Sequence, residues 1–138
     1  MSWDRDTRSL SDITFAQWSS ELAHCVTPGE AQLALAGIAG ELRGSLRIED
    51  ACGALGIEIK GAALAGQVGL AYRHHGRCLI LLDPVTPQRD RPFVIAHELG
   101  HHLLRLALRH GLPLKHEEPL CDYFASVVTG FSRAPLSA

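Results

Sequence analysis

Residues 93–104 read FVIAHELGHHLL, a stretch in which His97, Glu98 and His101 stand in the order H-E-x-x-H. Apolar residues recur around them at three- and four-residue spacing, which predicts an α-helix with a buried face. Residues four apart on a helix lie one above the other, so the imidazoles of His97 and His101 can bind one metal ion without backbone distortion. Gly100 would let another backbone approach this helix closely. The spacing is that of a zinc site.

Glu98 follows His97 by about a third of a helical turn, which places its carboxylate near the ion without pointing straight at it. A carboxylate so placed can take a proton from a zinc-bound water, whose pKa the ion lowers towards neutral. We therefore predict that His97 and His101 are metal ligands, that Zn2+ is the cofactor and that Glu98 is the catalytic residue. The alternative is a core helix that carries two solvated histidines and no metal.

Composition limits both the architecture and the partners. The chain has 138 residues, of which 46% are hydrophobic, so we expect a single domain over residues 1–138, with residues 1–10 flexible. The formal net charge of −2, with both signs interspersed, argues against direct nucleic-acid binding. The first twelve residues, MSWDRDTRSLSD, include acidic residues and lack the apolar segment of a signal peptide, and no apolar run is long enough to span a bilayer. We therefore expect a cytoplasmic protein without membrane attachment.

The cysteines are widely spaced and include no C-x-x-C pair, which predicts buried, reduced thiols and not a disulfide framework or a second zinc site. They are Cys25, Cys52, Cys78 and Cys121.

Local patterns predict an α+β fold with a helical N-terminal part. The first expected helix is short, is capped by Ser11 or Asp12 and carries Phe15, Trp18 and Leu22 on one face. The next runs from Thr27-Pro28-Gly29-Glu30 to about Gly44, and a third runs from Leu46 to Leu55, with Gly56 as its stop. The helix from Thr27 starts with that threonine as the capping residue, Pro28 at the first helical position and Glu30, whose carboxylate can accept a hydrogen bond from the Thr27 amide.

Alternating apolar and polar residues after Gly56 predict a small sheet packed on the zinc helix, with a hairpin whose tip is His75-Gly76. The expected strands are Ile57–Lys60, Gln67–Tyr72 and Cys78–Leu82, in an order that the sequence leaves open. The zinc helix should begin near Asp90 or Arg91, because Pro92 fits only its first turn, and should end near Arg109, before Gly111. A last helix is expected from about Glu117 to Gly130.

A catalytic zinc site usually has three protein ligands, so the two histidines need a third. His102 points about 100° away from His101, and His110 is too far along the same helix to reach back. Position 107, where another class of H-E-x-x-H enzymes has its third histidine, is alanine. The candidates that remain are His116, Glu117 and Glu118.

Three phrases, ALGIEI at 54–59, RPFVIAHELGHHLLR at 91–105 and EPLCDYFA at 118–125, resemble motifs of the ImmA/IrrE family of gluzincin-like zinc metallopeptidases. The last phrase is similar to the family's E-x-x-A-N/D-x-F-A. The resemblance covers a family-like core over residues 45–130, with a C-terminal helix that carries the third ligand. It implies Glu118 as that ligand and Asp122, one turn later, as a residue that orients a ligand histidine through its free N–H.

Two residues depart from the family pattern. Cys121 replaces a small alanine, and Pro119 sits inside the ligand phrase. Because a proline fits best in the first turn of a helix, Pro119 predicts that Glu117 or Glu118 stands at the very start of the last helix.

The resemblance implies a zinc-dependent metalloendopeptidase that cleaves a specific helix-turn-helix repressor in a stress response or in the induction of a mobile element. Glu98 would then act as general base and afterwards as acid, while the ion stabilises the oxyanion. His74 and His75, at the hairpin tip, are either solvated turn residues or a second oxyanion donor. The alternative function is a non-proteolytic, zinc-containing regulatory protein that docks a partner, as in a toxin–antitoxin pair. Glu98 argues against it, because a structural zinc site has no use for a general base.

Overall fold

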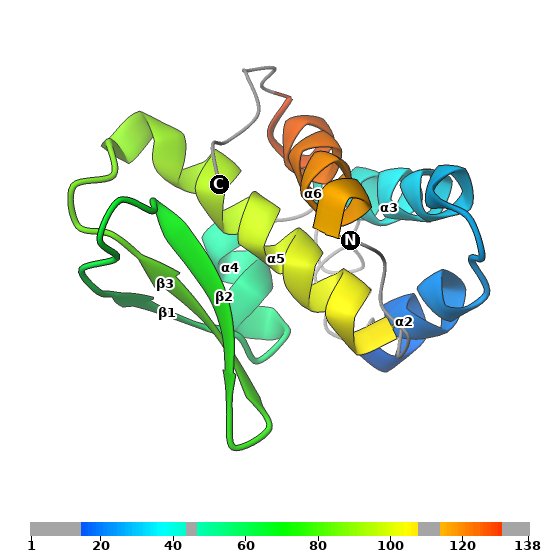
Figure 1. Cartoon of the computed structure of the whole chain (residues 1–138), viewed down its shortest axis with the longest axis horizontal. Coiled ribbons are helices and arrows are strands. Elements are labelled where there is room, and N and C mark those ends of the chain that lie inside the picture. Colours follow the sequence, from blue (N-terminus) through cyan, green and yellow to red (C-terminus); the bar gives the residue numbers. More distant parts are fainter. Residues whose placement is uncertain (1–14, 44–46, 108–113, 131–138) are drawn as a thin grey trace, which may run out of the picture.

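The computed structural model describes residues 15–43, 47–107 and 114–130, and the long helix α5 (Arg91–Ala107) runs through its middle (Figure 1). The small sheet and α4 lie on one side of α5, and the other three helices lie on the opposite side. The remaining elements are α2 (Phe15–Ala23), α3 (Pro28–Arg43), α4 (Ile48–Ala54), β1 (Glu58–Gly61), β2 (Gly69–His74), β3 (Arg77–Leu82), the 3-10 turn η1 (Gln88–Asp90) and α6 (Leu114–Thr129). The predicted α+β class is confirmed.

The start of α3 has the predicted reciprocal cap. The Glu30 amide donates to Oγ1 of Thr27 at 3.2 Å, and the Thr27 amide donates to Oε1 of Glu30 at 3.1 Å. Hydrogen bonds from the Val26 and Thr27 amides lower the pKa of Glu30. The cap pairs amides that the first turn of a helix would otherwise leave without partners.

The other predicted helix ends agree in part with the structure. Gly56, with a φ of +80°, is in the left-handed conformation that commonly follows a helix, and α4 ends two residues before it, at Ala54. The predicted caps Ser11 and Asp12 and the predicted flexible residues 1–10 lie outside the described residues. So does the predicted end of the zinc helix, at Arg109 and Gly111.

The three strands form a mixed sheet with the order β1-β3-β2. The central strand β3 pairs in parallel with β1 and antiparallel with β2. The hairpin tip is the predicted one, since His75 (φ +51°) and Gly76 (φ +77°) both have the left-handed backbone that a tight two-residue turn needs. Strand β2 is therefore an edge strand, and it packs on α5.

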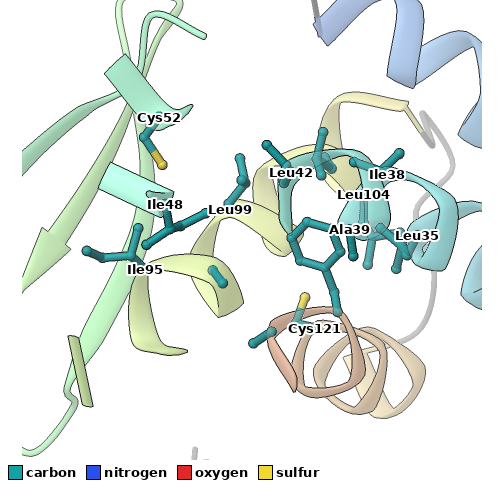
Figure 2. Packing of buried hydrophobic residues seen from close by; sticks show 14 of the residues in the cluster. Leu35, Ile38, Ala39, Leu42, Ile48, Cys52, Ile95, Leu99, Leu104 and Cys121 are labelled. Atoms are coloured by element: carbon teal, nitrogen blue, oxygen red, sulfur yellow. The ribbon is translucent and has the colours of Figure 1, made fainter. Parts of the chain in front are cut away.

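Helix α5 is enclosed by the rest of the fold, since every residue from Phe93 to Leu104 is buried. Figure 2 shows two groups of core side chains around it. Ile48 and Cys52 of α4 lie toward Ile95 and Leu99, while a group from α3 lies toward Leu104 and Cys121; the α3 residues are Leu35, Ile38, Ala39 and Leu42. A helix covered on all sides can hold polar side chains only where they find partners, so its histidines and Glu98 need buried partners.

Helix α6 approaches α5 closely at Gly100. A Cβ added there would lie 3.2 Å from Sγ of Cys121 and 3.3 Å from Cδ2 of Phe124. The small residue predicted to admit another backbone thus does so, and the helix that approaches is the one that carries Glu118. Neither α5 nor any other helix in the described ranges has the length and apolarity needed to cross a bilayer.

The predicted start of the last helix was wrong. Helix α6 begins at Leu114, so Pro119 is inside it and the two glutamates before Pro119 are not at its very start. A proline there removes the hydrogen bond to the Lys115 carbonyl, which argued for a later start. Both Lys115 and Pro119 are exposed, so water can replace the missing donor and the helix continues.

The cysteine prediction is correct in chemistry and partly correct in burial. All four cysteines are free; Cys52 and Cys121 are buried, whereas Cys25 and Cys78 are half-buried. Burial raises the pKa of Cys52 to about 12, and the nearby Glu49 charge adds to the rise. Such a thiol stays protonated and acts as a core residue.

Candidate metal centre

The predicted ligands meet where α6 crosses α5. His97, His101 and Glu118 each offer one ligand atom, and these atoms lie within 4.8 Å of one another. The two Nε2 atoms are 3.2 Å apart. Glu118 spans them, with one carboxylate oxygen 2.9 Å from Nε2 of His97 and the other 3.1 Å from Nε2 of His101. This group of residues could bind a metal ion.

The spacing of these atoms fits a tetrahedral ion. A tetrahedral metal with bonds of about 2.0–2.1 Å to nitrogen and oxygen has donor atoms about 3.3 Å apart. The Nε2 atoms of His97 and His101, at 3.2 Å, already have nearly that separation. The Nε2 atoms of both rings therefore face one point between α5 and α6, where an ion would bind, and Glu118 of α6 faces the same point.

Each imidazole has a carboxylate from α6 at its other nitrogen. Nδ1 of His97 lies 2.8 Å from Oδ1 of Asp122, which is ion-pair distance, and neither of these buried atoms has a hydrogen-bond partner within the described ranges. Nδ1 of His101 lies 2.5 Å from Oε1 of Glu117. A carboxylate at Nδ1 favours a proton on that nitrogen and leaves Nε2 free to bind a metal. The expected position of Asp122, beside a ligand histidine, is thus observed.

The candidates left open by the residues alone now separate. Glu118 faces the Nε2 atoms of both histidines, whereas Glu117 faces Nδ1 of His101. Glu117 also accepts a hydrogen bond from Nε of Arg105 at 2.8 Å. Burial alone would raise the pKa of Glu117, but the hydrogen bond from His101 and the charge of Arg105 outweigh burial and lower it. His116 belongs to no such ligand group in the part of the chain that the structure describes.

Glu98 lies on the side of α5 that faces the edge strand β2. Its side chain is buried, and the Ala71 amide donates a hydrogen bond to it. A Cβ added to Gly69 would lie 3.2 Å from Cγ of Glu98 and only 2.6 Å from Cγ1 of Val94. The glycine thus permits a contact between strand and helix that a larger residue would prevent.

The environment of Glu98 favours proton exchange. Burial raises the pKa of Glu98, while the neighbouring His97 and His101 oppose the rise. A carboxylate whose pKa moves from its usual value towards neutrality is a better general base near pH 7, because it holds a captured proton more firmly.

The remaining histidines have other surroundings. His74 and His75 are exposed at the hairpin tip, where their ring centroids are 4.1 Å apart and Nδ1 of His74 lies 3.4 Å from the Tyr72 hydroxyl. Nε2 of His102 bonds to the Leu79 carbonyl of β3 at 2.7 Å, and burial lowers the pKa of that ring. None of the three belongs to the metal group.

Sequence reasoning missed Arg105, Gly69 and Ala71. Arg105 has a usable signal, since it stands four residues after His101 and so lies on the same face of the helix. Gly69 and Ala71 have none, because only the packing of β2 on α5 brings them to Glu98.

A search of protein-family models, of curated proteins and of solved structures found no match to this chain. The resemblance to the ImmA/IrrE family stays a prediction that rests on its three phrases, and the metal centre rests on the geometry of its residues.

Proposed function

We propose that the chain is a zinc-dependent metalloendopeptidase that acts in the cytoplasm on a protein substrate. The observation that carries the proposal is the position of Glu98, a buried carboxylate next to a group of two histidines and a glutamate. Two imidazoles and one carboxylate are a ligand set of known catalytic zinc sites. A site that only held an ion for structural reasons would not need a buried carboxylate beside it.

Zinc, when bound, would supply a Lewis acid that makes a water molecule acidic enough to react near neutral pH. Glu98 would take a proton from the attacking water and would later give it to the departing amide nitrogen. The hydrogen bond from the Ala71 amide would hold the Glu98 carboxylate in place beside β2.

The edge strand β2 favours an extended peptide as the substrate. In the register with β3, Leu70 and Tyr72 pair with Leu81 and Leu79, and the peptide groups of the alternate residues point away from β3. Of these alternate residues, Ala71 already donates its amide to Glu98, and Gly69 and Arg73 keep theirs for a substrate. An extended segment can pair with such an edge by main-chain hydrogen bonds. Because Glu98 lies against the same strand, a segment held there would pass close to the general base.

For the substrate we propose a helix-turn-helix repressor, as the family resemblance implies. The net charge of −2 supports a division of labour in which the repressor binds DNA and this chain does not. Both proteins would then meet in the cytoplasm.

Glu98→Gln tests the proposal, because glutamine keeps the size and most of the hydrogen bonding while removing the base. The purified variant should retain zinc and fold, while cleavage of the proposed repressor substrate should fall about 10²–10⁴-fold. Fragments are followed on a gel and by mass spectrometry.

Glu21→Gln, an equal change at an exposed position of α2, serves as the control and should cleave normally. If wild type and Glu98→Gln regulate the repressor equally well in cells and neither cuts it, the docking protein is the correct interpretation.

A further inference from the structure

We propose that Glu117, held by Arg105, is a positioning residue that fixes the tautomer of His101 and thereby raises the affinity of the metal centre for zinc. The inference rests on the metal centre of the proposed function and does not require proteolysis. It concerns a buried carboxylate that neither binds the ion nor touches a substrate in the mechanism above.

The two adjacent glutamates of α6 have different tasks. The Glu118 side chain is 39% exposed and spans the two Nε2 atoms, whereas the Glu117 side chain is 7% exposed and points to Nδ1 of His101. Oε1 of Glu117 lies within hydrogen-bond distance of this Nδ1, and a hydrogen bond to a carboxylate is charge-assisted and therefore stronger than one between neutral groups. With the Nδ1 proton committed to Glu117, Nε2 of His101 keeps its lone pair for the ion.

Arg105 holds Glu117 in this position. It lies one turn after His101 on α5, and its Nε donates to the same oxygen, Oε1 of Glu117, at 2.8 Å. The guanidinium compensates part of the negative charge of a site in which Glu98, Glu118 and Asp122 also contribute carboxylates. The buried carboxylate of Glu117 therefore has two donors and a countercharge.

Without Glu117, the same arginine would oppose metal binding by His101. Nη2 of Arg105 lies 3.5 Å from Nδ1 of His101, and a guanidinium can only donate. If Glu117 is removed, Arg105 can donate to Nδ1, which forces the ring proton onto Nε2, the nitrogen that must bind the ion. Glu117 thus protects the metal-binding tautomer from the arginine that supports it.

This arrangement makes a prediction that a simple packing role does not. Glu117→Ala should weaken zinc binding by about 100-fold, and Arg105→Ala by about 10-fold, which are the limits usual for residues that orient ligands. Because the remaining arginine causes part of the first loss, the double variant Glu117→Ala/Arg105→Ala should bind zinc more tightly than Glu117→Ala alone.

The experiment measures the dissociation constant of Zn2+ by competition with a chromophoric chelator. NMR of the zinc-loaded proteins follows the Nδ1 proton of His101, which should resonate far downfield in the wild type, where it is hydrogen-bonded to Glu117, and lose that shift in Glu117→Ala. Glu21→Gln is the control and should leave both readouts unchanged. Thermal unfolding of each metal-free variant establishes that it is folded. If Glu117→Ala is not, Glu117→Gln takes its place, with an expected loss of about 10-fold because the amide oxygen keeps a weaker hydrogen bond.

The inference is overturned if folded Glu117 variants bind zinc as tightly as the wild type, or if the double variant is weaker than both single variants. It is also overturned if Glu117→Ala loses zinc entirely while Glu118→Ala retains it, since Glu117 would then be a ligand. A protein that binds zinc as predicted and cuts no repressor would contradict the proposed function and leave this inference standing.

Discussion

At the scale of single residues, the site depends on which nitrogen faces which carboxylate. The sequence predicts His97, His101 and Glu98 from spacing alone, because helix geometry fixes the relation between positions 97, 98 and 101. It could not separate Glu117 from Glu118 without the family resemblance. The two are neighbours in sequence, and only the packing of α6 on α5 decides which of them reaches the Nε2 atoms of His97 and His101.

Gly69 gives a residue-scale prediction. In Gly69→Ala the new Cβ would lie 2.6 Å from Cγ1 of the buried Val94, so that side chain or β2 must shift, and a shift of β2 would also disturb its contact with Glu98. Overpacking of this kind costs about 1–3 kcal/mol in the free energy of unfolding. Denaturant unfolding measures that loss, and cleavage should fall as well.

The matched control is Gly61→Ala on β1, where the nearest atom to an added Cβ is the Leu82 carbonyl oxygen at 3.9 Å. It should be nearly neutral. Equal stabilities for the two variants would mean that β2 does not pack on α5 as closely as described.

At the scale of elements, the best predictions rest on signals that act within a few residues. The start of α3 and the hairpin tip at His75-Gly76 are set by local hydrogen bonds and by backbone conformation, and both were predicted correctly. The start of α6 was missed because the rule that places proline in a first turn describes the helix alone. It does not count the water that can reach the Lys115 carbonyl.

Thr27→Ala tests the cap of α3. The substitution removes the acceptor for the Glu30 amide, and the loss of an N-cap side chain costs about 1 kcal/mol in the free energy of unfolding. Ser20→Ala, on an exposed face of α2, changes the same kind of group outside a cap and should cost less. Thermal unfolding compares the two variants, and a cap without effect would contradict the reciprocal pair.

At the scale of the whole molecule, α5 is enclosed between the sheet with α4 and a layer of α2, α3 and α6 (Figure 1). The α+β class was predictable because the hydrophobic period changes from helix to strand near Gly56. The order β1-β3-β2 was not, since a strand of four residues carries no information on which neighbour it pairs with. That order makes β2 an edge strand, and this edge is where we propose that the substrate binds.

The fold also predicts a loss of stability in acid. Asp83 accepts hydrogen bonds from the Leu64 and Val85 amides, which lower the pKa of its carboxyl from the usual value of 3.8. A carboxyl with a lowered pKa contributes stability above its unfolded value and loses that contribution as the pH falls through its folded value. The midpoint of thermal unfolding should therefore fall as the pH drops below about 4, and Asp83→Asn should reduce that fall. A parallel profile for the variant would contradict the role given to Asp83.

The most direct test of the account is the metal content of the purified protein, measured by inductively coupled plasma mass spectrometry beside His97→Ala, His101→Ala and Glu118→Ala. We expect one zinc ion per chain in the wild type and in Glu98→Gln. The three ligand variants should lose most of it, because each removes one of the donors that meet within 4.8 Å. Full zinc occupancy in His97→Ala and His101→Ala would place the metal elsewhere, and a wild type that takes up no zinc would contradict the account at its centre.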